Sequence, residues 1–134
     1  MQSSTSLRLP SNPKYVSAVE PYVERLVKSC VSCPDKYGDI LISITEAVTN
    51  AIVHGNTNDE SKIVRVSFKK DADKVAFSVT DEGRGFDPAS VPDPTCPENL
   101  LKVGGRGVFL MKELSDNINF RNGGSTVELQ FKVR

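Results

Sequence analysis

The segment ITEAVTNAIVHG, residues 44–55, has the residue spacing of a buried helix. That spacing predicts an amphipathic helix that ends at Gly55, a residue type favoured just past a helix C-terminus. Glu46 and Asn50 lie one turn apart beside the apolar stripe, so a carboxylate and a carboxamide share one face. Apolar residues recur at steps of three and four through the segment and just before it: Ile40, Leu41, Ile44, Ala47, Val48, Ala51 and Ile52.

Glu46 and Asn50 have two interpretations when they are taken alone. The first is a hydrogen bond between the two side chains at the edge of a buried helix, worth about 0.2–0.5 kcal/mol. The second is that Asn50 offers a hard oxygen to Mg²⁺ while Glu46 orients or deprotonates a nucleophile. Because Mg²⁺ usually keeps several waters and binds substrate phosphates, a single carboxamide ligand is chemically sufficient.

The rest of the chain alternates between helical and strand periodicity. Residues 14–30 have helical spacing, and CPDKYGD at 33–39 interrupts it before the next helix. Residues 82–103 are rich in Gly, Pro and Asp, and a loop of that length is usually a functional lid or disordered. A short helix is predicted over 107–114, and strands are predicted over 5–11, 62–70, 75–79, 117–121 and 125–133.

Alternating strands with one apolar face, together with amphipathic helices, predict an α+β fold. We expect a two-layer α/β sandwich in which helices pack on one face of a mixed, mostly antiparallel sheet. The length of 134 residues suits a single domain over residues 1–134.

Composition excludes several classes of protein. The 17 Lys and Arg residues balance the 17 Asp and Glu residues, which argues against direct nucleic-acid binding. The longest apolar runs are a few residues, far short of the roughly 20 needed to span a bilayer, so we expect a cytoplasmic protein with no membrane contact.

The three cysteines are predicted to be reduced and structural. Cys30 and Cys33 form the only close pair, which as CVSC also fits a redox pair or half of a zinc site. Cys96 and the single His54 are the only further Cys or His ligands that such a zinc site could use.

The segment VTDEGRGFDP, residues 79–88, places Asp81 at the end of a predicted strand, followed by Gly83 and Gly85. Asp and Gly are ordinary turn residues, so a simple turn is one interpretation. The other is a ligand site in which the carboxylate accepts a hydrogen bond from an exocyclic amine. Glycines would then let the backbone approach a flat ligand. Adenine offers that amino donor, whereas guanine offers a carbonyl that a carboxylate repels.

The segment GGRGVFLMKEL, residues 104–114, places glycines where the long loop meets a helix. Backbone N–H groups at a helix N-terminus favour phosphate, and Arg106 could contact a phosphate or a partner. The segment lacks the G-K-[ST] of a P-loop. The glycines could instead serve only as hinges of the loop.

Taken in order, these segments resemble the GHKL family of ATP-binding domains, which have the Bergerat fold. EAVTNAIVHG (46–55) is similar to its N box, DEGRGF (81–86) to its first glycine box and GGRGVFLM (104–111) to its second. The resemblance covers nearly the whole chain and implies an ATP lid at about residues 86–106. That short lid is most similar to the lid of bacterial anti-sigma factor serine kinases of the RsbW type. Sensor histidine kinases share the fold but also need a phosphoacceptor helical hairpin, which we do not expect here.

The resemblance implies a role for each motif residue. Asn50 would hold Mg²⁺, Glu46 would act as general base, and Asp81 would recognise adenine with Gly83 and Gly85 allowing its close approach. The last group would close over the phosphates: Gly105, Arg106 and Gly107.

Ser125 stands where the family usually has a Thr that contacts the base through water. Strand alternation places Ser125 on the face of Val127 and Leu129, toward the helices, and Thr126 on the opposite face.

The implied function is that of an anti-sigma factor with serine/threonine protein kinase activity. It would bind a sigma factor and, with ATP and Mg²⁺, phosphorylate a serine on a STAS-type anti-sigma factor antagonist, leaving ADP. Homodimerisation is typical of the resembled family. The alternative is a non-catalytic partner-switch module that binds ATP or ADP and sequesters a regulatory protein.

Overall fold

Five strands form one sheet in the order β1-β2-β3-β5-β4, and each is antiparallel to its neighbours. The computed structural model describes residues 6–28, 30–31, 34–83 and 105–133. The strands of this part of the chain are β1 (Leu7–Pro10), β2 (Ile63–Lys70), β3 (Lys74–Thr80), β4 (Asn117–Arg121) and β5 (Thr126–Lys132).

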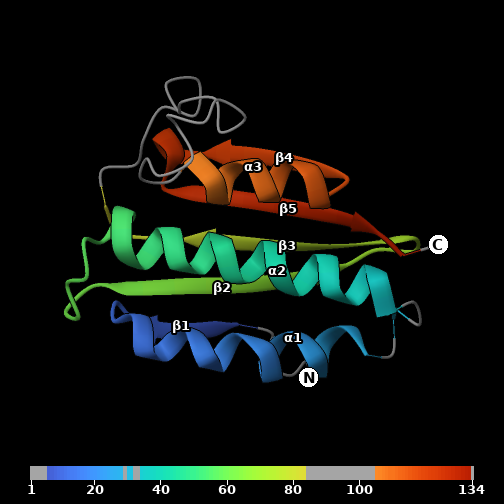
Figure 1. Ribbon diagram of the computed structural model, residues 1–134, viewed down its shortest axis with the longest axis horizontal. Helices are drawn as coiled ribbons and strands as arrows, with labels where there is room; N and C mark the ends of the chain where they lie inside the picture. Colours follow the sequence, from blue (N-terminus) through green and yellow to red (C-terminus); the bar gives the residue numbers. More distant parts are fainter. Residues whose placement is uncertain (1–5, 29, 32–33, 84–104, 134) are drawn as a thin grey trace.

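Helices cover one face of this sheet (Figure 1). This arrangement confirms the predicted α+β fold with a mostly antiparallel sheet. The described helices are the 3₁₀ helix η1 (Pro13–Ala18), α1 (Val19–Val27), α2 (Pro34–Asn50), the π-helical turn η2 (Ala51–Gly55), α3 (Gly105–Leu114) and the 3₁₀ turn η5 (Asn122–Gly124).

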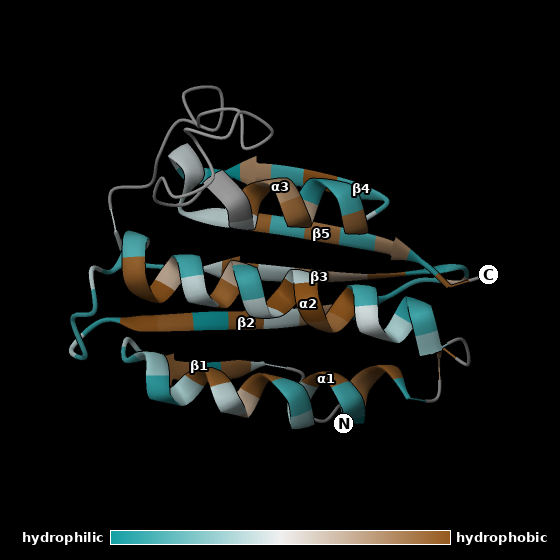
Figure 2. Cartoon of the chain, in the orientation of Figure 1, coloured by the Kyte–Doolittle hydropathy of each residue, from teal (hydrophilic) through white to brown (hydrophobic). Residues whose placement is uncertain are grey.

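The core lies between the helices and the strand side chains that alternate toward them. Phe77 on β3 pairs in register with Phe68 on β2 and Leu129 on β5, and its ring centroid lies 5.0 Å from that of Phe68. Figure 2 shows hydrophobic and hydrophilic residues alternating along the strands and around the helices. The largest fully buried side chains include Phe77, Phe131, Ile40, Ile44, Ile52, Met111, Leu129, Val48 and Val64.

Helix α2 begins at Pro34, so the predicted interruption at 33–39 is wrong for Pro34–Asp39. Proline has no N–H to satisfy and its fixed φ suits the first helical turn. Asp35 in that turn is favourably placed near the positive end of the helix dipole. Gly38 lies within the helix, and a Cβ atom at that position would meet nothing within 4 Å. Proline and glycine are therefore accommodated here rather than acting as helix breakers.

The first predicted helix, over residues 14–30, is divided into two. Residues Pro13–Ala18 form a 3₁₀ helix that Asn12 caps, since its Oδ1 accepts a hydrogen bond of 3.0 Å from the Lys14 N–H. The α-helix proper begins at Val19 and ends at Val27. The periodicity of the apolar residues was correct, but it did not distinguish 3₁₀ from α geometry.

The C-terminal end of α2 widens into the π-helical turn η2. The Asn56 N–H donates to the Ala51 carbonyl at 2.8 Å, a bond across five residues instead of four. Such turns are rare and frequently accompany functional sites. Here the turn leaves Ile52 and Asn56 completely buried.

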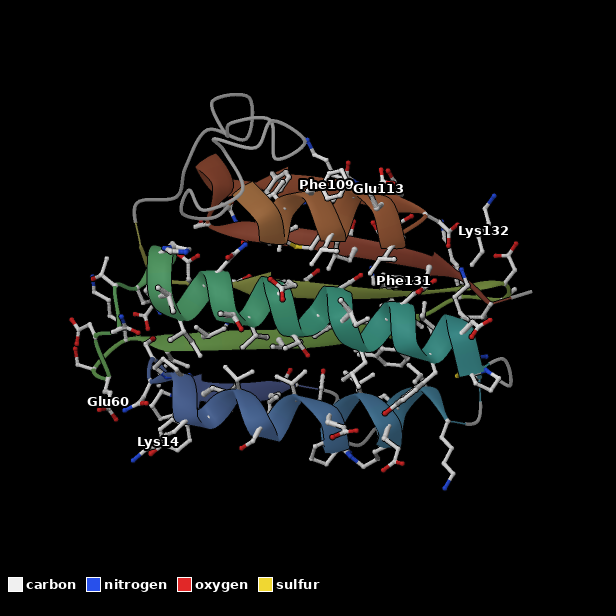
Figure 3. All side chains as sticks on the ribbon, in the orientation of Figure 1. Lys14, Glu60, Phe109, Glu113, Phe131 and Lys132 are labelled. Atoms are coloured by element: carbon white, nitrogen blue, oxygen red, sulfur yellow. The ribbon has the colours of Figure 1, made fainter. Side chains whose placement is uncertain are left out.

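The two ends of the sheet differ in what they carry. The ends of α2 and β3 and the start of α3 lie together at one end (Figure 1). The β2–β3 turn, with its exposed residues 71–73, lies at the other. In Figure 3, Glu60 marks the first end and Lys132 the second.

No described helix has the length and apolar character that crossing a membrane requires.

Phe77 provides a test of the core. We expect Phe77→Ala to lower the free energy of unfolding by about 3–5 kcal/mol, because it removes a fully buried ring and leaves a cavity. Urea denaturation followed by circular dichroism measures this change. The control is Lys69→Ala on the exposed side of β2, which should change the free energy by less than about 0.5 kcal/mol. A loss below about 1 kcal/mol for Phe77→Ala would contradict this description of the core.

Candidate functional site

Helix α2 presents Glu46 and Asn50 to the first turns of α3. Both side chains are half-buried, while Ile44, Ala47 and Val48 on the same helix are buried in the core. A Cβ atom added to Gly107 would lie 2.8 Å from Asn50 Nδ2, 3.3 Å from Asn50 Oδ1 and 3.0 Å from Glu46 Oε1. The fold therefore brings the predicted base and metal ligand against the second glycine segment.

Gly107 makes this approach because it has no side chain. It is a buried residue of α3, and the following residues Val108 and Met111 hold the helix in the core at 4% and 2% exposure. A larger residue at position 107 would force the ends of the Asn50 and Glu46 side chains to move from these positions. Gly105 and Arg106 are the first two residues of α3. Gly85 and residues 86–104 of the predicted lid lie outside the described residues.

Asp81 follows the last residue of β3 and is held by backbone hydrogen bonds. Its N–H donates to the Ser125 carbonyl at 2.9 Å, and its Oδ1 accepts from the Gly83 N–H at 2.8 Å. Burial raises the pKa of Asp81 above its ordinary value, although the Gly83 N–H and the positive charge of Lys62 act in the opposite direction. A carboxylate kept partly from water is suited to bind a polar group of a ligand.

Two glycines bring Asp81 against the end of α2. A Cβ atom on Gly55 would overlap the Asp81 carboxylate, and one on Gly83 would overlap the Gly55 carbonyl. Gly55 therefore has a role that helix termination alone did not reveal. It allows the end of the α2–η2 helical segment and the Asp81 turn to touch through their backbones.

The backbone carbonyl of Ser125 accepts the hydrogen bond from Asp81, so the two residues are neighbours. The turn before it has positive φ at Asn122 (54°), Gly123 (68°) and Gly124 (98°), and the Ser125 hydroxyl donates to the Asn122 carbonyl at 3.0 Å. Thr126 pairs in register with Thr80, and their hydroxyl oxygens lie 3.0 Å apart. Ser125 itself precedes the strand, so its side chain belongs to the turn.

The two clusters lie along one helix. Gly107 contacts Glu46 and Asn50, and Asp81 contacts Gly55, five residues after Asn50. The two clusters are therefore only five residues apart on one continuous helical segment. One cluster offers the Asp81 carboxylate and glycine backbone, and the other offers the Asn50 carboxamide and the Glu46 carboxylate. Together they can bind an elongated polar ligand with chemically different ends.

Magnesium is the metal that this donor set suits. Among the described residues, no group of three or more His, Cys, Asp and Glu side chains could hold a metal ion. Mg²⁺ does not require such a group, because water and substrate phosphates complete its octahedral shell. The carboxamide oxygen of Asn50 and the carboxylate of Glu46 are hard oxygen donors beside the same glycine.

The described residues give no support to a zinc site at the cysteines. Cys30 lies at the end of α1, where its thiol donates to the Leu26 carbonyl at 3.7 Å. Cys33 and Cys96 lie outside the described residues.

Sequence reasoning missed three polar residues behind Asp81. Ser11 and Asn56 are completely buried and Glu82 is exposed, yet hydrogen bonds connect all three segments. No periodic signal marks them, because they lie in turns where neither helical nor strand spacing applies.

Comparison with known proteins identifies the family. The model of the histidine kinase-like ATPase domain matches residues 9–131. The chain is 27% identical over 136 residues to the serine-protein kinase RsbW of Staphylococcus epidermidis, covering 96% of this chain and 86% of that protein. It is 28% identical over 131 residues to RsbW of Staphylococcus aureus (strain Newman), covering 92% and 82%.

Solved structures share the fold. One holds the RsbU and RsbW domains of Rv1364c from Mycobacterium tuberculosis, with a TM-score of 0.59 and 20% identity, and the match covers 96% of this chain and 32% of that one. Another is the histidine kinase domain of the blue-light activated kinase EL346 from Erythrobacter litoralis, with a TM-score of 0.52 and 17% identity, covering 99% and 65%. The chain belongs to the histidine kinase-like ATPase domain family, the GHKL ATPases, and its relatives include RsbW serine-protein kinases.

Proposed function

We propose that this chain is an ATP-dependent protein serine kinase and anti-sigma factor. The observation that carries the proposal is the contact of Gly107 with both Glu46 and Asn50. This contact puts a carboxylate, a carboxamide and the start of a helix at one place, which is the equipment that phosphoryl transfer needs. The similarity to RsbW serine-protein kinases supports the choice of a protein serine as acceptor.

Glu46 is the general base in this proposal. Its carboxylate takes the proton from the serine hydroxyl as that oxygen forms a bond to the γ-phosphorus. The bond from the γ-phosphorus to its bridging oxygen breaks, and ADP leaves with the electron pair. Asn50 would hold Mg²⁺, which would supply charge neutralisation on the phosphates.

The remaining site residues bind the nucleotide. Asp81 accepts a hydrogen bond from the adenine amino group, and Gly83 and Gly85 allow the base to approach the backbone. Ser125 contacts the base beside Asp81. A lid at about residues 86–106, with Gly105, Arg106 and Gly107, covers the phosphates.

The partners follow from the type of kinase. A sigma factor is the protein that the chain would sequester, and a STAS-domain antagonist carries the serine that it would phosphorylate. We expect the active form to be a cytoplasmic homodimer that binds ATP and ADP.

One experiment separates this proposal from a non-catalytic partner switch. The chain would be used to capture its partners from the native cell, and the complex would then be incubated with γ-labelled ATP and Mg²⁺. Transfer of label to a serine of a captured partner supports the kinase. Partner binding that depends on nucleotide, without any transfer, would favour the switch module.

Glu46→Ala tests the base. We expect it to keep nucleotide affinity within about twofold and to reduce phosphorylation of the partner serine by about 10²–10⁴, the usual contribution of a general base. Labelled-phosphate transfer and ADP titration calorimetry measure the two quantities. Glu113→Ala, an exposed carboxylate on the same helix as Gly107, is the matched control and should alter neither. Unchanged turnover in Glu46→Ala would exclude the base assignment.

Asp81→Asn is expected to change stability and binding in opposite directions. Because burial raises the pKa of Asp81, the folded protein binds this proton more tightly than the unfolded chain does. The ionised carboxylate therefore costs stability once the pH is above that raised pKa, and Asn removes this cost. Its amide oxygen can still accept from the Gly83 N–H.

The measurements are thermal melting between pH 4 and pH 8 and ADP titration. The melting temperature of Asp81→Asn should exceed that of wild type at neutral pH, and the difference should shrink as the pH falls and wild-type Asp81 takes up its proton. ADP affinity should fall about 10- to 100-fold, the value of a hydrogen bond to a charged group. Asp71→Asn in the exposed β2–β3 turn is the control. Equal ADP affinity in both proteins would rule out the adenine role.

Gly107→Ala tests the close contact between α2 and α3. The added methyl group would lie 2.8 Å from Asn50 Nδ2 and 3.0 Å from Glu46 Oε1, so both side chains must move aside. We therefore expect Mg-ADP binding at least about tenfold weaker, with a loss of unfolding free energy of no more than about 1 kcal/mol. Gly38→Ala is the matched control, since its Cβ would meet nothing within 4 Å. It should stabilise the protein by about 0.5–1 kcal/mol. Unchanged Mg-ADP binding in Gly107→Ala would show that the close contact is not present in solution.

A further inference from the structure

A buried polar cluster lies behind Asp81 and has no part in the function proposed above. Ser11 and Asn56 are both 0% exposed, although neither carries an apolar side chain. Burying such groups is costly unless each is hydrogen-bonded, so a fully bonded pair holds its neighbours in one arrangement.

Asn56 uses both ends of its carboxamide to connect different segments. Its Nδ2 donates to Ser11 Oγ at 2.9 Å and to the Ile63 carbonyl at 3.3 Å. Its Oδ1 accepts from the Glu82 N–H at 2.8 Å. Ser11 in turn donates to the Lys62 carbonyl at 2.7 Å. One side chain thus joins the turn after β1, the start of β2 and the residue after Asp81.

Glu82 is attached to the same cluster by its side chain. Its carboxylate accepts a hydrogen bond from the Ile63 N–H, beside the Ile63 carbonyl that Asn56 contacts. The segment 81–83 is therefore anchored at Glu82 through both backbone and side chain. Glu82 is exposed, so the completely buried half of this anchor is Asn56.

The position of Asn56 in the chain lets this anchor link the end of α2 to the Asp81 turn. Asn56 directly follows Gly55, whose backbone touches the Asp81 carboxylate and Gly83. A hydrogen bond from Glu82 to Asn56 therefore fixes the distance between the end of α2 and the Asp81 turn. The side chain of serine or alanine at position 56 could not reach the Glu82 N–H. The Asp81 turn would then no longer be held at a fixed position relative to the end of α2.

We propose that Asn56 is a positioning residue that holds Asp81 at the place where it selects adenine over guanine. This inference rests on the proposed nucleotide-binding function. It predicts that loss of the Asn56 to Glu82 bond lowers base selectivity, whereas contacts to the phosphates, made near Asn50 and Gly107, are unaffected.

The variants are Asn56→Ala and its matched control Ser11→Ala. Ser11→Ala removes one of the two acceptors of the Asn56 Nδ2 group but leaves the bonds to Ile63 and Glu82 in place. Both variants disturb the same buried cluster, so a general loss of stability would affect them alike. If Asn56→Ala does not fold, Asn56→Ser replaces it, because its side chain is polar but too short to reach Glu82.

The first measurement needs no nucleotide. Amide hydrogen exchange should show the Glu82 N–H protected in wild type and in Ser11→Ala, and exposed in Asn56→Ala, with the β3 amides of Phe77 and Val79 protected in all three. Unchanged protection of Glu82 in Asn56→Ala would overturn the proposal.

The second measurement compares affinities for ADP, GDP and inorganic tripolyphosphate, which has no base. We expect Asn56→Ala to reduce the preference for ADP over GDP about tenfold, to leave tripolyphosphate affinity within twofold, and Ser11→Ala to keep the preference. An equal loss of preference in both variants would overturn the positioning role. If wild type bound ADP and GDP equally, the proposed function would fail instead, and amide exchange would still decide whether Asn56 holds the turn.

Discussion

Helix α2 and the π-helical turn η2 that continues it lie across the sheet. Four of their isoleucine and valine side chains are completely buried: Ile40, Ile44, Val48 and Ile52. Because these side chains are packed in the core, the backbone of the polar residues between them is held in place relative to the sheet. Glu46 and Asn50 meet α3 from this helix, and Gly55 at its end meets Asp81. The same packing that holds the protein together thus determines the spacing between the two halves of the candidate site.

The parts of the fold that could be predicted from the sequence are those with a regular period. Alternation in β2, β3 and β5 identified the paired strands, and steps of three and four identified the buried face of α2. The start of α2 could not be predicted, because Pro34 and Gly38 also occur in turns and only the structure shows that α2 accommodates both. The 3₁₀ geometry of Pro13–Ala18 could not be predicted either, because its apolar spacing resembles that of an α-helix.

The candidate site was predictable in its motif residues but not in its supporting residues. Glu46, Asn50, Asp81, Gly83 and Gly107 were expected together, and the structure places them at two neighbouring points along α2. Asn56 was not expected, because its importance depends on a bond across 26 residues to Glu82, which no local pattern encodes. Ser11 is still more distant, at 45 residues from Asn56. Long-range polar contacts of this kind depend on the completed fold.

The separation between the two ends of the sheet has a practical consequence for watching this protein at work. The exposed β2–β3 turn at residues 71–73 lies at the opposite end from Asp81 and Gly107, and short polar turns of this kind tolerate insertion and chemical modification well. A fluorescent reporter or a tether to a surface could be placed there, away from the end of α2, the start of α3 and the Asn56 cluster. Ligand and partner exchange could then be followed in real time on single molecules whose binding end remains unobstructed.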